Sequence, residues 1–251
     1  MTSKREAQLH EAHHLPLTLC IRHDQHALVV GAGEVGLRKI ANLLAFGVAV
    51  VCVEPQFIAQ DEIIDRIVEV KPFTSRSLAD KDLYARAQER LTVRVKPFEP
   101  ADITESTVLA FACTSSQSCN AAVYQACREK GVLFNSAMKL PNMNEFYLPA
   151  TLIRGDFSVS IATAGKSPSL ARKERLALED RYSDTFGDYL DLLGEVRDLV
   201  LSQIDGDAVI HRAYLRALHK LPLLAACEAG ETLDAHAVFS DLCERMRGER
   251  P

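Results

Sequence analysis

The sequence predicts an α/β protein, with a Rossmann-type parallel sheet, a small β-hairpin and then a helical C-terminal region. Three observations support this fold class. A short apolar run, 27–30, leads through a glycine-rich turn into residues with helical spacing. Further apolar runs alternate with helical segments as far as residue 136, which is typical of βαβ units. After residue 167, the apolar residues recur at the helical period.

The glycine-rich turn GAGEVG contains Gly31, Gly33 and Gly36. In a strand–turn–helix unit, the first glycine allows a sharp turn and the second lets the backbone approach a pyrophosphate. The third lets the helix pack against the strand. Glu34 and Val35 lie where the helix begins, and a helix N-terminus favours phosphate groups. We expect these five residues to form a dinucleotide site. The alternative is a turn of the same shape that binds nothing.

An acidic residue follows the next apolar run, 48–53. It is Glu54, which lies 18 residues beyond Gly36. A carboxylate about 20 residues after the glycines can accept hydrogen bonds from the ribose 2′-hydroxyl of NAD. It would repel the 2′-phosphate of NADP, and no arginine follows it directly to offset the repulsion. The sequence therefore predicts NAD as the cofactor.

The composition excludes several classes of protein. The 251 residues are 47% hydrophobic and 25% charged, with a net charge of −5, which argues against a general nucleic-acid binder. No stretch approaches the ~20 apolar residues of a membrane span. Seven cysteines without a CxxC pattern predict reduced thiols in a cytoplasmic protein. We expect no metal site, and a site built from Cys113 and Cys119 is the weaker alternative.

The expected elements of the first region follow a polar tail, 1–14. Expected strands are 15–21, 27–30, 48–53, 108–113 and 132–134, and expected helices are 36–46 and about 120–130. The segments RIVEVKPF (66–73) and LTVRVKPF (91–98) resemble one another, and either one fits the third strand of the sheet. An exposed helix is expected between them.

Polar residues follow two of the expected strands. Thr114, Ser115 and Ser116 come after 108–113, and Asn135 comes after 132–134. In a doubly wound sheet, the loops at the carboxyl ends of the strands line the cofactor crevice. These residues are therefore candidate cofactor neighbours. Turn and helix-cap roles are the equal alternative for each of them.

The chain changes character after residue 137. Two β-like runs, 146–153 and 157–163, form an expected hairpin, after which Ser167 can cap a helix that begins at Pro168. The expected helices are 168–182, 185–204, 207–220 and 234–247. We expect three domains: a NAD-binding Rossmann domain over 1–136, a dimerisation hairpin region over 137–167, and a helical domain over 168–251.

Several segments together resemble the precorrin-2 dehydrogenase family, which also forms the N-terminal module of siroheme synthases. They are GAGEVGLRK, AFACTSSQSCN, the turn at Asn135 and FYLPATLIRGDFSVSIATAGKSPSLAR. The resemblance covers roughly 15–205, and its most specific part is the hairpin that runs into TAGKSPSLAR. It implies NAD-dependent oxidation of precorrin-2 to sirohydrochlorin, insertion of ferrous iron in some members, and a homodimer joined through the hairpin region.

The resemblance also implies a tetrapyrrole substrate that carries many carboxylates. Polar and cationic side chains should surround such a substrate. The candidate substrate-binding residues are Lys139, Thr163, Lys166, Ser167 and Arg172, and Arg38, Lys39 and Lys173 are further candidate cations. Taken alone, each of these cations fits a solvated surface charge better.

The chain departs from the family at Met138, which stands where the family has an aspartate shortly after the residue matching Asn135. The nearest acid that follows is Glu145. The general base is therefore unassigned, and we expect a dehydrogenase without efficient ferrochelatase activity. Two alternatives stay open: a NAD-dependent dehydrogenase of another small substrate, and a non-enzymatic NAD-binding regulatory protein, which the loss of the aspartate favours.

Overall fold

The computed structural model describes residues 15–56, 59–70, 80–138 and 143–248. The chain divides into two compact units. The first extends to Pro149 and includes Ala164–Lys166, and the second comprises Ala150–Thr163 and Ser167–Pro251. The described part has the predicted fold class: a five-stranded parallel sheet, a β-hairpin and a helical C-terminal region.

The first unit is built on the parallel sheet, whose strand order is β3-β2-β1-β4-β5. The strands are β1 (His26–Val30), β2 (Ala49–Glu54), β3 (Leu91–Val95), β4 (Thr107–Ala112) and β5 (Leu133–Ser136). The chain winds outward from β1 to β3 and then returns to place β4 on the other side of β1. The order reverses between β1 and β4, and ligands of doubly wound sheets bind at that point, beyond the carboxyl ends of the strands.

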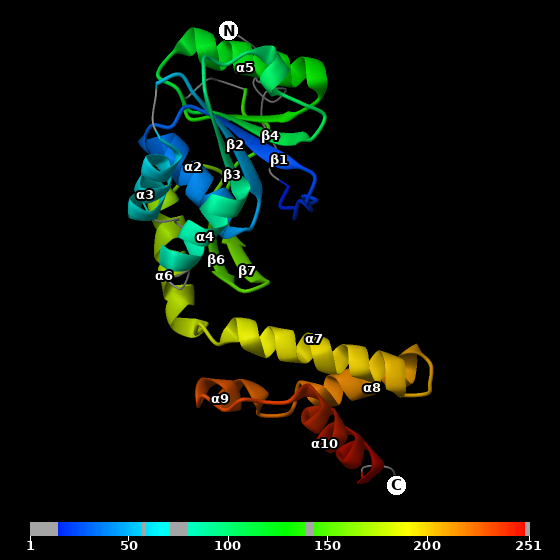
Figure 1. Ribbon diagram of the computed structural model, residues 1–251. Coiled ribbons are helices and arrows are strands. Elements are labelled where there is room, and N and C mark those ends of the chain that lie inside the picture. Colours follow the sequence, from blue (N-terminus) through cyan, green and yellow to red (C-terminus); the bar gives the residue numbers. More distant parts are fainter. Residues whose placement is uncertain (1–14, 57–58, 71–79, 139–142, 249–251) are drawn as a thin grey trace, which may run out of the picture. The chain divides into compact units, whose positions relative to one another are not determined.

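Helices cover both faces of this sheet (Figure 1). On one face lie α2 (Glu34–Ala45), α3 (Gln60–Val70) and α4 (Asp80–Arg90), and on the other lies α5 (Gln117–Lys130). Alternate strand residues face the two layers: Val29, Cys52 and Phe111 pack with α2–α4, whereas Leu28, Val53 and Ala112 pack with α5. Because both faces are buried, the central strands read as continuous apolar runs. A short 3₁₀ helix, η1 (Pro100–Asp102), precedes β4.

The expected strand over 15–21 is wrong. No strand forms there, and Leu15, Leu17 and Leu19 are 81%, 71% and 45% exposed. The alternating leucines suit a strand, but β1 already has β2 and β4 on its two sides. The sheet ends at β3 and β5, and residues 15–21 pair with neither of them.

The two VKPF segments adopt different structures. LTVRV forms β3, whereas RIVEV forms the end of α3, with Ile63, Ile64 and Ile67 buried at helical spacing. Residues 71–73 of the first copy lie outside the described part of the chain. The helix expected between the copies is present as α4. It is less exposed than expected, because Leu83 and Ala87 are buried in the core of the first unit.

The second unit begins with a two-stranded antiparallel hairpin, β6 (Ala150–Arg154) and β7 (Phe157–Ile161). The helices α6 (Pro168–Arg181), α7 (Phe186–Gln203), α8 (Ala208–Leu218), α9 (Leu223–Glu228) and α10 (Ala235–Gly248) follow it. Ser167 caps α6 as predicted, because its Oγ accepts a hydrogen bond of 3.3 Å from Leu170 N–H. The short helix α9 was not predicted. Buried residues of α7, α8 and α10 form a separate core around Val196, Val200 and Leu242.

The hairpin is packed within its own unit. Leu152 is fully buried, and the ring of Phe157 lies 4.5 Å from that of Phe186 at the start of α7. The buried Arg154 donates from Nε to the carbonyl oxygens of Tyr182 and Ser183, at 3.0 and 3.1 Å. The hairpin therefore packs against the helical part of its own chain.

Candidate functional site

The glycine-rich turn lies between the carboxyl end of β1 and the start of α2, and its glycines have three different surroundings. Gly31 has φ of +100°, and a Cβ on it would lie 2.9 Å from the carbonyl carbon of Cys113. A Cβ on Gly36 would lie 1.9 Å from the carbonyl oxygen of Gly31, so the helix approaches the turn too closely for any side chain. A Cβ on Gly33 would meet nothing within 4 Å. Gly33 therefore borders open space at the start of α2.

The N-terminus of α2 has no side-chain cap. Gly33 is its N-cap residue, and no side-chain hydrogen bond caps the first turn. The first N–H groups of a helix have no partner within the helix, so they suit an anion. Glu34 points its carboxylate into solvent, 79% exposed and 3.8 Å from Arg38, and Val35 is 36% exposed. The turn therefore has the shape and the free donors of a diphosphate site.

Glu54 ends β2 beside this turn. Its Oε2 accepts a hydrogen bond of 2.7 Å from Ala32 N–H, and its Oε1 accepts one of 3.1 Å from Gln56 N–H. The carboxylate is thus fixed at the carboxyl edge of the sheet. The sequence indicated Glu54 by its spacing from the glycines, but the bond to Ala32 joins residues 22 positions apart and carries no local signal.

The loop after β4 is fixed by a buried asparagine that the sequence analysis missed. Asn120 is fully buried: its Nδ2 donates to the Thr114 carbonyl at 2.9 Å and its Oδ1 accepts from Thr114 Oγ1 at 2.7 Å. Ser116 caps α5 by accepting from Cys119 N–H at 3.2 Å. Ser115 is exposed at the tip of the loop. Thr114 and Ser116 therefore shape the loop, whereas Ser115 faces outward.

The segment after β5 is held beside the strand in a similar way. Asn135 was expected to follow this strand, but the strand continues to Ser136 and includes it. Asn135 is buried and donates from Nδ2 to the Phe146 carbonyl at 2.8 Å. Asn144, another residue that the sequence analysis missed, accepts from Ser136 N–H at 2.6 Å. Glu145 accepts from Phe134 N–H at 2.9 Å and lies 3.4 Å from Arg128 Nη1. Both oxygens of Glu145 are thus occupied in holding its segment beside β5.

Met138 is 36% exposed, and its N–H donates to Ser136 Oγ at 3.2 Å. Lys139 lies outside the described residues. Because Glu145 is bound to Phe134 and Arg128, no described acid takes the place of the family aspartate in this turn.

Lys39 is less solvated than a surface lysine. It lies one turn beyond Gly36, with Nζ 5.5 Å from the centroid of the Phe111 ring. Burial lowers the pKa of Lys39, the nearby Cys113 thiol acts in the opposite direction, and Arg38 lowers it further. Burial in turn raises the pKa of Cys113 to about 11. No carboxylate of the described residues lies within ion-pair distance of Lys39, which makes it an uncompensated cation beside β4.

The candidate substrate residues of the hairpin region lie close together in sequence. Ser167 N–H donates to Thr163 Oγ1 at 3.3 Å, and Lys166 and Arg172 are exposed. The residues between Thr163 and Lys166 adopt left-handed backbone, with φ of +50° at Ala164 and +74° at Gly165. Ser167 uses its Oγ to cap α6, so the hydroxyl that we expected beside substrate already has a partner.

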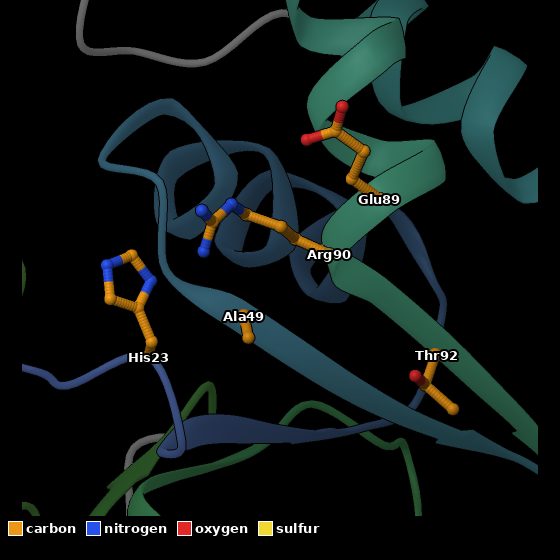
Figure 2. Close-up of a pocket in the computed structure, with 5 residues that line it drawn as sticks. All are labelled: His23, Ala49, Glu89, Arg90 and Thr92. Atoms are coloured by element: carbon orange, nitrogen blue, oxygen red, sulfur yellow. The ribbon is translucent and has the colours of Figure 1, made fainter.

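A shallow hollow of about 310 Å³ lies at the ends of the strands opposite the glycine-rich turn (Figure 2). His23, Ala49, Glu89, Arg90 and Thr92 line it, and Arg90 extends toward His23. Ala49 begins β2 and Thr92 lies near the start of β3, so the hollow belongs to the amino ends of the strands. It is distinct from the glycine-rich turn.

Within the described residues, no three His, Cys, Asp or Glu side chains gather as a metal site. No helix in the same ranges is long and apolar enough to cross a bilayer.

Comparison with known proteins gives one consistent picture. A family model described as "Putative NAD(P)-binding" matches residues 20–150. The siroheme synthase of Methylococcus capsulatus is 32% identical over 239 residues, which cover 95% of this chain and 45% of that protein. Siroheme synthase 2 of Aeromonas salmonicida is 28% identical over 88% of this chain and 41% of its own length. This chain therefore spans less than half the length of these relatives.

One solved structure has the same fold. It is described as SirC, precorrin-2 dehydrogenase, and is 20% identical with a TM-score of 0.65. The match covers 92% of this chain and 100% of that one. At this level of identity, the similarity is evidence of a shared fold.

Proposed function

Since the chain belongs to the family of precorrin-2 dehydrogenases and siroheme synthase N-terminal modules, we propose that it oxidises precorrin-2 to sirohydrochlorin with NAD as hydride acceptor. The observation that supports this most directly is the turn at Gly31–Gly36. It combines a sharp backbone, an open position at Gly33 and an uncapped helix N-terminus with a fixed carboxylate at Glu54. These features together fit a dinucleotide.

The residues present fit the parts of NAD. Gly33, Glu34 and Val35 offer backbone N–H groups to the diphosphate, and Glu54 keeps acceptor capacity for the ribose hydroxyls, because a carboxylate has about four acceptor positions. Thr114 and Ser115 lie in the loop after β4, and Asn135 lies near the end of β5, on the side of β1 where the nicotinamide half would extend. When bound, NAD supplies the hydride acceptor.

Glu54 also supports NAD over NADP. A 2′-phosphate beside this carboxylate would be repelled. Lys96, which follows β3, is a cation close to Glu54. Its N–H donates to the Glu54 carbonyl at 3.1 Å. Its ammonium is already bound to Glu99 at 2.8 Å and to Asp102 at 3.0 Å. Lys96 is therefore engaged elsewhere.

The protein's part in the oxidation is to orient the substrate and to receive a proton. Precorrin-2 loses a hydride to the nicotinamide and also loses a proton, and holding the reacting carbon in position supplies much of the rate. We assign the substrate carboxylates to Lys139, Lys166 and Arg172, with hydrogen bonds donated by the hydroxyls of Thr163 and Ser167. Both hydroxyl oxygens already accept backbone N–H groups, and their hydrogens can still donate. The general base stays unassigned.

We also propose that the chain inserts iron poorly. Ferrous iron enters sirohydrochlorin as two pyrrole protons leave, so a nearby carboxylate is the natural proton acceptor and transient ligand. Met138 offers a thioether, which is not basic, and Glu145 is bound to Phe134 and Arg128. Hydride transfer depends less on such a group.

The ferrochelatase prediction is tested by supplying sirohydrochlorin and ferrous iron anaerobically, with and without the protein. We expect sirohaem to form at the uncatalysed rate. A rate well above it would contradict the prediction. If Met138→Asp created chelation, the missing carboxylate would be identified as the cause.

The oxidation itself is tested by incubating the purified chain with NAD and precorrin-2 and recording the sirohydrochlorin spectrum. A dehydrogenase of another substrate would bind NAD and leave precorrin-2 unchanged. A regulatory NAD-binding protein would also bind NAD and leave precorrin-2 unchanged, and it would reduce NAD with none of the small substrates offered. The Met138 substitution favours this alternative.

A further inference from the structure

Glu54 contacts the glycine-rich turn directly, in addition to the ribose contact that we propose for it. Its Oε2 accepts the Ala32 N–H at 2.7 Å, and Ala32 is the residue between Gly31 and Gly33. The preceding N–H, that of Gly31, donates to the Val53 carbonyl at 2.9 Å. Two successive N–H groups of the turn are therefore held by the last two residues of β2.

The second oxygen of Glu54 is engaged as well. Oε1 accepts the Gln56 N–H at 3.1 Å, so each oxygen receives a backbone donor. Only a carboxylate satisfies both donors. A glutamine has one acceptor oxygen and one NH₂ group, and that NH₂ would face one of the two N–H donors without a bond. Ala32 is 3% exposed, so water has little access to replace a lost partner.

We propose that Glu54 is the positioning residue of the glycine-rich turn: its carboxylate holds Ala32 and thereby sets the backbone that Gly33 and the first turn of α2 present to the diphosphate. The effect of this role on cofactor binding rests on the proposed function. The contact with Ala32 itself exists without cofactor. Glu54 therefore acts both on the turn and on the choice between NAD and NADP.

The two roles make different predictions for variants. If Glu54 were only a selector, its removal would lower NAD affinity, raise NADP affinity and leave the turn unchanged. As a positioning residue, its removal also loosens the turn, which serves both dinucleotides. The gap between NAD and NADP then narrows mainly because NAD affinity falls, and NADP does not reach the wild-type affinity for NAD.

The test compares Glu54→Ala, Glu54→Gln and the control Asp65→Asn, which removes an exposed carboxylate on α3. Amide hydrogen exchange of Ala32 is measured by NMR without cofactor, with the Leu28 amide as a probe of the sheet core. We expect exchange at Ala32 to be at least about tenfold faster in Glu54→Ala, since a charge-assisted hydrogen bond is lost. Glu54→Gln should fall between this variant and wild type, and Asp65→Asn should match wild type.

The second arm measures dissociation constants for NAD and NADP. We expect both Glu54 variants to bind NADP at least about tenfold more weakly than wild type binds NAD. Unchanged exchange at Ala32, or equal acceleration at Ala32 and Leu28, would overturn the positioning role. If the wild type binds no NAD, the proposed function fails, and the exchange arm still decides whether Glu54 holds the turn.

Discussion

At the scale of single residues, the three glycines of the turn make separable predictions. Gly33→Ala places a methyl group in open space at the start of α2, so the chain should fold with a loss of less than about 1 kcal/mol, the usual cost of alanine at an N-cap. The same methyl group would occupy the space that we assign to the diphosphate. We expect NAD affinity to fall at least about tenfold, measured by calorimetry.

Gly36→Ala should instead lower the stability of the fold. Its methyl group would lie 1.9 Å from the Gly31 carbonyl oxygen, so the helix must move away from the turn. We expect a loss of about 3 kcal/mol or more in the free energy of unfolding, at the upper end for overpacking. Gly194→Ala, on α7 with nothing within 4 Å of the added methyl group, is the control for both. Unchanged NAD affinity in Gly33→Ala would contradict the assignment of the diphosphate.

Lys39 makes a prediction about pH. Its pKa is lowered from 10.5, chiefly by burial, so the folded chain binds this proton less tightly than the unfolded chain does. Stability must then rise with pH between the lowered pKa and 10.5, and the cost of the buried charge is fully present below that range. Lys39→Met should be more stable than wild type at neutral pH, and the difference should shrink as the pH approaches 10.5.

Urea unfolding of wild type and Lys39→Met at neutral pH and near pH 10.5 measures this difference in stability directly. Lys173→Met, which removes an exposed cation of α6, is the matched control and should show no such pH dependence. A difference that stays constant with pH would mean that the charge of Lys39 costs nothing in the folded chain.

The sequence predicted the glycines and Glu54 because their spacing is fixed by the turn itself. It did not reveal the bond from Ala32 to Glu54, nor the roles of Asn120 and Asn144. Each of those bonds depends on where another loop lies in space. Asparagine in the first turn of a helix is common enough to carry no signal alone.

At the scale of elements, the loop between β4 and α5 depends on Asn120. Its side chain satisfies both the carbonyl and the hydroxyl of Thr114, at 2.9 and 2.7 Å. Asn120→Ala should cost about 1–3 kcal/mol, because the Thr114 carbonyl loses its side-chain donor and the Thr114 hydroxyl keeps only its bonds with the Ser116 backbone. Gln125→Ala, an exposed change on the same helix, is the control in denaturant unfolding. Equal stability of the two variants would show that the loop is held by other contacts.

The strands and helices of the first unit were largely predictable because each buries a local pattern. The exceptions show what competes with such a pattern. The alternating leucines of 15–21 form no strand and stay exposed, and RIVEV joins α3 because Ile63, Ile64 and Ile67 bury one helical face. The α9 helix has six residues, too few to show a period in the sequence.

At the scale of the whole molecule, we predict a homodimer. The resemblance to the precorrin-2 dehydrogenase family supports it. A two-stranded hairpin alone is marginally stable in water, which would favour a partner, but this hairpin packs within its own chain. Leu152 is buried within its own chain, and Phe146 packs edge-on against Phe111 at 5.1 Å. Light scattering at micromolar concentration should give twice the mass of the chain, and a monomer with the fold intact would contradict the prediction.

We also keep, as a proposal about which parts of the chain fold independently, the three domains that the sequence predicts: 1–136, 137–167 and 168–251. The contacts divide the chain differently, with the hairpin in the same unit as the C-terminal helices. A period-2 pattern identifies a hairpin, but it does not say which core the hairpin joins. The contacts of Arg154 with Tyr182 and Ser183 explain why this one joins the helices.

The stoichiometry of the reaction tests the proposed oxidation of precorrin-2 most directly. Purified chain is given precorrin-2 and NAD without oxygen, and NADH and sirohydrochlorin are quantified together, with Gly33→Ala as the matched variant. We expect one NADH for each sirohydrochlorin formed by wild type, and a rate at least about tenfold lower for Gly33→Ala at limiting NAD. Sirohydrochlorin formed without NADH, or precorrin-2 left unchanged by a chain that binds NAD, would contradict it.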